Sequence, residues 1–168
     1  SHDGRTLIMF RTSEDLIGGD LYFSKFEYGQ WQKPIKLDDH INSEFSEASA
    51  CLNRDGNVMY FSSNRPGGFG GKDIYRTMLF GNGDWSLPTN LGPTINTPFD
   101  DDAPFISNDD STLYFSSDGH KTIGGFDIFK SKKNHEAGLW SLPQNLGYPL
   151  NTVEDDIYFV MTGDERTG

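Results

Sequence analysis

Short runs of apolar and β-branched residues alternate with turn residues along the whole chain. The clearest example is 48–52 and 58–61, two such runs on either side of the turn 53–56. That turn contains Asp-Gly, which supplies positive-φ positions, so the stretch predicts a β-hairpin. No stretch shows the 3.6-residue spacing of an amphipathic helix, and an all-β fold is therefore expected.

The same succession of strands returns along the chain. A hairpin of the same form is expected over 105–115, and its second half recurs at 7–10. A glycine-bearing loop, 62–71, leads to a third short strand at 73–75. A fourth strand around Pro88 is expected at the edge of the unit, because proline lacks the amide donor that an interior strand needs. Four short antiparallel strands, repeated, are the blade of a β-propeller.

Certain residues mark the same positions in each copy, with a period of 54–55 residues. A fixed period of this length is typical of propellers and related arrays. Residues shared by all copies meet the same packing problem in each blade, so we interpret them as structural, and we expect the tryptophans to pack between neighbouring blades. They are Asp20, Asp73 and Asp127, Trp31, Trp85 and Trp140, and Asn42, Asn96 and Asn151.

The period predicts one β-propeller domain over 1–168, a fragment of about three four-stranded antiparallel blades whose ends are out of phase with the blade boundaries. The first repeat is partial (1–45), two full repeats follow (46–99 and 100–154), and 155–168 is a lone first strand. Propellers close with about four to eight blades, so further blades of the same parent chain are expected to complete the ring. Two chains that pair into a six-bladed ring are the alternative.

Two stretches carry a family resemblance. Residues 55–75 read DG-x3-YFSSNRPGGFGG-x-DIY, and residues 109–129 read DD-x3-YFSSDGHKTIGGFDIF. They resemble WD-repeat-like blades of the TolB type, most nearly those of OmpA-family envelope proteins of Gram-negative bacteria, which include type nine secretion components. The resemblance covers essentially the whole chain. It implies a periplasmic, outer-membrane-associated scaffold without catalytic activity, whose partners are other envelope proteins or peptides.

Charge narrows the class of partner. The chain has 14 Lys and Arg against 25 Asp and Glu, a net charge of -11, and no basic run, so nucleic acid is not an expected partner. No stretch approaches the roughly 20 apolar residues that cross a bilayer, so direct membrane insertion is not expected. The single cysteine, Cys51, has no second cysteine with which to form an internal disulfide.

Candidate functional residues are sought where the copies differ on one rim. In a propeller, the loop that leads into strand one and the loop between strands two and three lie on the same face. Arginine and aromatic side chains on such loops are frequent anchors at protein interfaces. We therefore predict a partner-binding rim of Arg65, Phe69, Lys72, Asp100, Asp101, Asp102, His120 and Lys121.

Metal and enzyme chemistry are weighed against this interpretation. The run Asp100 to Asp102 suggests calcium, but consecutive strand residues point to opposite faces, so we expect one carboxylate per blade to bond a neighbouring loop, as at Glu47 and Asp156. No metal or cofactor is predicted, and no nucleophile or metalloenzyme motif is present. The alternative function is a carbohydrate lyase or hydrolase that uses His40 or His120 at the channel mouth, or a sugar-binding propeller.

Overall fold

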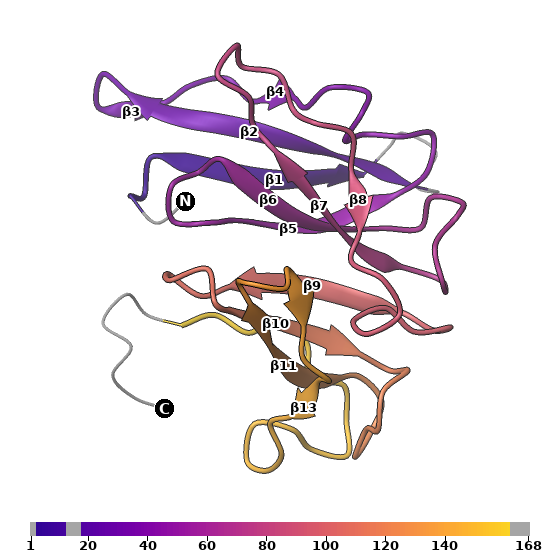
Figure 1. Cartoon of the computed structure of the whole chain (residues 1–168). Helices are drawn as coiled ribbons and strands as arrows, with labels where there is room; N and C mark the ends of the chain where they lie inside the picture. The colour runs from indigo at the N-terminus through magenta and orange to yellow at the C-terminus, as the bar shows by residue number, and fades with distance from the viewer. Residues whose placement is uncertain (1–2, 13–17, 162–168) are drawn as a thin grey trace.

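The computed structural model describes residues 3–12 and 18–161, and these form three antiparallel sheets without a helix (Figure 1). The first sheet contains β1 (Thr6–Thr12), β2 (Gly19–Glu27), β3 (Gln30–Trp31) and β4 (Ile35–Lys36). The second contains β5 (Glu47–Leu52), β6 (Val58–Ser63), β7 (Asp73–Met78) and β8 (Thr89–Asn90). The third contains β9 (Asp101–Ile106), β10 (Thr112–Ser117), β11 (Asp127–Asn134), β12 (Leu139–Trp140) and β13 (Gln144–Asn145). The predicted all-β propeller architecture is confirmed.

The hydrophobic core lies between the sheets. Side chains of a strand alternate between its two faces, and β6 shows the consequence. Met59 and Phe61 pack in a cluster with the first sheet, whereas Val58 and Tyr60 pack in a second cluster with the third sheet. The second sheet is therefore buried on both faces, as a blade with a neighbour on each side must be.

The outermost strand of each blade is broken by its proline. In the second blade Trp85 forms an isolated bridge with Leu79, and pairing resumes at β8. Between them, Thr77 Oγ1 donates to the carbonyl of Ser86 (2.7 Å). Ser24 and Ser131 make the same bond to the carbonyls of the equivalent residues, at 2.6 Å in each case. A hydroxyl on the third strand of each blade (β2, β7 or β11) thus takes the place of the backbone ladder bonds that a continuous outer strand would have made.

The tryptophans of the second and third blades pack on the preceding blade. Trp85 joins the cluster between the first and second sheets, and Trp140 meets Tyr60 edge-on at 6.3 Å. Trp31 differs from the prediction, since 47 % of it is exposed. It belongs to the first blade, and no sheet in the described part of the chain precedes that blade.

One sequence equivalence needs correction. Met9 lies opposite Tyr22 as Phe61 lies opposite Tyr75, so 6–9, rather than 7–10, corresponds to 58–61. The predicted lone strand 155–168 forms no ladder over 155–161, and its remainder lies outside the described residues. A ladder needs a second strand alongside, and β10 is already paired with both β9 and β11.

Candidate functional site

The two kinds of rim loop are in contact. At the junction of the second and third blades, Gly71 N donates to Phe99 O (2.9 Å) and Lys72 N donates to Asp100 Oδ1 (2.7 Å). A Cβ at Gly70 would lie 2.1 Å from the same Phe99 oxygen. The glycine pair therefore serves close backbone contact between neighbouring blades rather than phosphate binding.

Arg65 is turned into the protein at the junction of the first and second blades. Its guanidinium donates to the carbonyls of His40 (3.2 Å) and Ile41 and forms an ion pair with the buried Glu47 (3.1 Å). It also lies 5.2 Å above the rings of both Phe61 and Tyr75. This predicted anchor is thus engaged within the chain.

His120 occupies the equivalent place one blade further on. Its Nε2 donates to the carbonyl of Ile95 (2.8 Å), which is the counterpart of Ile41. Its ring packs on Phe115 at 5.7 Å and on Phe129 at 5.2 Å, the counterparts of the two rings beneath Arg65. We call Arg65 and His120, with their aromatic pairs and carbonyl acceptors, the junction braces.

Asp101 faces the preceding loop and is completely buried. Its Oδ2 accepts hydrogen bonds from Thr97 N (2.5 Å) and Thr97 Oγ1 (3.0 Å), while Oδ1 has no hydrogen-bond partner among the described protein groups. Burial raises the pKa of Asp101. Glu47 and Asp156 accept the same bond from a backbone N–H four residues earlier, so one carboxylate per blade does bond a loop.

Asp102 points the other way and joins the second blade to the third. Its carboxylate accepts hydrogen bonds from Lys72 Nζ (2.7 Å), Ser62 Oγ (2.5 Å) and Ser49 Oγ. Burial opposes the ionised form, but these donors outweigh it and lower the pKa of Asp102. Burial likewise opposes the charge on Lys72, and the bond to Asp102 with its charge attraction outweighs this and raises the pKa of Lys72.

Several of the exposed side chains of the rim are apolar. Lys121 is exposed, as is Phe69, of which 47 % is accessible. Sequence reasoning missed three more large apolar residues on rim loops, with exposed fractions of 42 % for Phe45, 58 % for Phe99 and 52 % for Ile123. A signal for two of them was present, since Phe45 and Phe99 occupy the same position in successive repeats.

The positions shared by all copies hold the blades together internally. Asn42, Asn96 and Asn151 each bond both the N–H and the carbonyl of one strand-three residue; for Asn96 this is Ile74, at 2.8 and 3.0 Å. Asp73 accepts bonds from its own rim loop and from Asn90, and Asp127 does the same with Asn145. Asp20 instead pairs with Lys36 (3.0 Å), the counterpart of Asn90.

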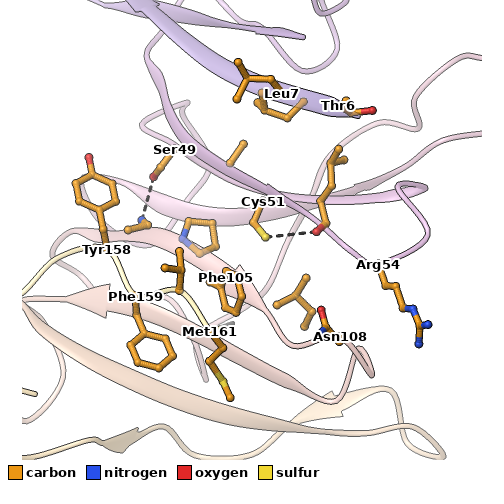
Figure 2. Close-up of a pocket in the computed structure, with 17 residues that line it drawn as sticks. Thr6, Leu7, Ser49, Cys51, Arg54, Phe105, Asn108, Tyr158, Phe159 and Met161 are labelled. Atoms are coloured by element: carbon orange, nitrogen blue, oxygen red, sulfur yellow. Dashed lines mark hydrogen bonds between the residues drawn. The ribbon is translucent and has the colours of Figure 1, made fainter. Parts of the chain in front are cut away.

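A groove of about 550 Å³ runs along the inner strands. It is lined by β1, β5, β9 and the segment 158–161 (Figure 2). Leu7 and Met161 line it from opposite sides, and Cys51 of β5 lies between them. Burial raises the pKa of the Cys51 thiol, which disfavours the reactive thiolate.

Two further observations concern chemistry and membranes. His40 is exposed and His120 is bound in a junction brace, and no group of three His, Cys, Asp or Glu in the described residues is placed to hold a metal ion. Within 3–12 and 18–161, no helix has the length and apolarity to span a membrane.

Comparison with known proteins supports the architecture. No protein-family model and no curated protein sequence matches the chain. Among solved structures, the chain is similar to a putative TolB from Agrobacterium tumefaciens, with a TM-score of 0.56 and 19 % sequence identity. The likeness establishes the fold. It covers 88 % of this chain and 47 % of that chain, so the present chain spans about half the length of that structure.

Proposed function

We propose that this chain is part of a non-catalytic β-propeller scaffold of the bacterial cell envelope that binds other envelope proteins or peptides at its rim. The observation that carries the proposal is a difference between two groups of rim side chains, those held in contacts between blades and those left exposed. Three of the polar ones, Arg65, His120 and Asp102, are occupied by contacts between blades. Phe69 and Phe99 are left half exposed on loops that touch one another, and exposed aromatic side chains gathered on loops mark protein interaction sites.

The finer form of the proposal concerns place and assembly. We place the scaffold in the periplasm, associated with the outer membrane, in a secretion or peptidoglycan-anchoring complex. The motif resemblance of 55–75 and 109–129 to blades of OmpA-family and type nine secretion proteins supports this form. The acidic surface, with a net charge of -11, is consistent with a protein partner rather than nucleic acid.

Site-specific photo-crosslinking tests the interaction face. A benzoylphenylalanine at position 69 or 99 is exposed to a periplasmic extract of a Gram-negative bacterium, and the adducts are identified by mass spectrometry. The matched control carries the same group at Leu87, which is 70 % exposed on the outer edge of the same blade. Adducts to one defined envelope protein are expected from the rim positions alone. Equal adducts from position 87, or none from the rim, would contradict the proposed site.

A further inference from the structure

A pocket of about 510 Å³ lies between the first and second blades. Its walls include Ile8 and Phe23 of the first blade, and Leu79 and Trp85 of the second. The turns that follow β5 and β7 border it, and both turns lie at the end of the second blade opposite its rim loop. We call this space the interblade pocket. Its volume falls within the range of small-molecule sites.

Side chains occupy the equivalent place between the second and third blades. Tyr60 is buried there and meets Trp140 edge-on, with ring centroids 6.3 Å apart. Lys133 Nζ lies 5.7 Å above the Trp140 ring, and Asp110 Oδ2 accepts a hydrogen bond from Asn53 Nδ2 (2.9 Å). The ladder registers and turn bonds give the equivalent positions: Ile8 corresponds to Tyr60, Phe23 to Arg76, Gly56 to Asp110, Leu79 to Lys133 and Trp85 to Trp140.

Smaller side chains leave the first junction open. Ile8 lacks the ring that Tyr60 supplies, and Gly56 has no side chain where Asp110 carries a carboxylate. The backbone has the same form at that turn, since Gly56 has a φ of 69° and Asp110 a φ of 57°. Trp85 is therefore left with room for an aromatic ring of the kind that the next junction contains.

Two cations that line the interblade pocket have no carboxylate partner in the described part of the chain. Lys25 and Arg54 are exposed and belong to none of its ion pairs, whereas Lys36 is paired with Asp20 (3.0 Å). Lysine and arginine bind carboxylates through charge-assisted hydrogen bonds. A ligand carboxylate therefore has two donor side chains available.

The aspartates of the pocket are mostly engaged in their own turns. Asp3 and Asp38 each accept a hydrogen bond from the backbone N–H two residues later, at 2.9 and 3.0 Å. Asp84 accepts one from Asn82 Nδ2 (2.7 Å), and Asp55 is exposed. Among these described residues, fewer carboxylates than cations remain for a ligand, which favours an anionic ligand over a cationic one.

We propose that the interblade pocket binds a small aromatic carboxylate. The ligand ring lies beside Trp85 as the Tyr60 ring lies beside Trp140, and the ligand carboxylate faces Lys25 and Arg54. Aromatic rings prefer such edge-on contacts, and a carboxylate gains charge-assisted hydrogen bonds from both cations. The chain would then bind a small molecule in addition to a protein at its rim.

A pair of probes that differ only in charge tests the ligand class. 4-Hydroxyphenylacetate should shift the NMR signal of the Trp85 indole N–H, which W85F identifies, and should leave that of Trp140 unchanged because Tyr60 already covers it. Tyramine carries an ammonium in place of the carboxylate and should bind at least about tenfold more weakly. No shift of the Trp85 signal at millimolar 4-hydroxyphenylacetate, or equal binding of tyramine, would overturn the proposal.

Substitutions taken from the other blades test the residues. K25M/R54N introduces the residues found at the same positions in other blades, Met78 and Asn108, and should weaken binding of 4-hydroxyphenylacetate at least about tenfold without a change in Tm. K132M, at the same position of the third blade, is the matched control and should bind as wild type. I8Y/F23R fills the pocket with the pair that the next junction accommodates and should abolish binding. Full affinity in K25M/R54N, or in a folded I8Y/F23R protein, would contradict the assignment.

Discussion

Replacing Arg65 by alanine tests how much the junction braces contribute to stability. The substitution removes hydrogen bonds to two carbonyls of the first blade, the ion pair with Glu47 and the contact with two aromatic rings. Only 16 % of the Arg65 side chain and none of the Glu47 side chain is exposed, so water does not replace these contacts well. The loss should therefore exceed that of a surface ion pair.

The magnitude follows from what Glu47 retains. Removal of one partner of a buried ion pair costs about 3–5 kcal/mol when the other charge is left uncompensated. Glu47 keeps hydrogen bonds from Ser43 N, Ser43 Oγ and Ser63 Oγ, so the lower end applies. We expect R65A to lower the free energy of unfolding by about 3 kcal/mol. For a chain of this size that corresponds to a fall in Tm of roughly 6–12 °C.

Equilibrium urea denaturation of wild type, R65A and R65H measures the effect. R65H introduces the residue that the next blade uses at this position, and it should lose less stability than R65A because an imidazole can still donate to the Ile41 carbonyl. A loss below about 1 kcal/mol in R65A, as for an exposed salt bridge, would refute the reasoning. A loss in R65H equal to that in R65A would show that the carbonyl contact contributes little.

The remaining predictions concern buried polar groups. The pKa of Asp101 is raised by burial, so the contribution of this carboxyl to the free energy of unfolding is fully present below the unfolded pKa near 3.8 and is lost as pH rises through the folded value. D101N should therefore raise Tm at neutral pH but not in acid. The pKa of Asp102 is lowered despite its burial, because Lys72, Ser49 and Ser62 donate to it. The contribution of this carboxylate to the free energy of unfolding is present above the unfolded pKa and is lost as pH falls through the folded pKa, so D102N should lower Tm at neutral pH. N96A leaves the buried N–H of Ile74 without a partner, while the Ile74 carbonyl keeps the bond from Leu91 N. The substitution should cost about 2 kcal/mol in urea denaturation, whereas N82A, in an exposed turn, should cost less than about 0.5 kcal/mol.

The repeat made the architecture predictable. The turn 53–56 with its flanking apolar runs predicted the β5–β6 hairpin, and strand alternation predicted that Asp101 and Asp102 would face different partners. These features depend on local chemistry and on a period of two, both of which are written in the sequence. The proline that breaks the outer strand is visible in the sequence, but the hydroxyl of the blade's third strand that bonds the carbonyl beside the break meets it only after the sheet has formed, so that contact was not predictable.

The direction in which the rim side chains point could not be predicted from the sequence, for a related reason. A loop has no fixed period, so nothing in the sequence says whether Arg65 points to solvent or to the preceding blade. The deciding contacts are the carbonyl of Ile41, 24 residues earlier, and the rings of Phe61 and Tyr75. The exposure of the Phe99 ring likewise has no signature in its loop sequence.

The junction braces show that a residue can differ between repeats and still have the same structural role. Arg65 and His120 differ in size and charge, which suggested a functional rim, yet each donates to the equivalent carbonyl of its junction and rests on the equivalent aromatic pair. The buried carboxylate that bonds a loop in each blade differs too: it is Glu47 in the second blade and the shorter Asp101 in the third. A substitution between copies can thus be a second solution to one packing problem. Side chains that the scaffold leaves unoccupied, as it leaves Phe69 and Phe99, remain the better candidates for contact with a partner.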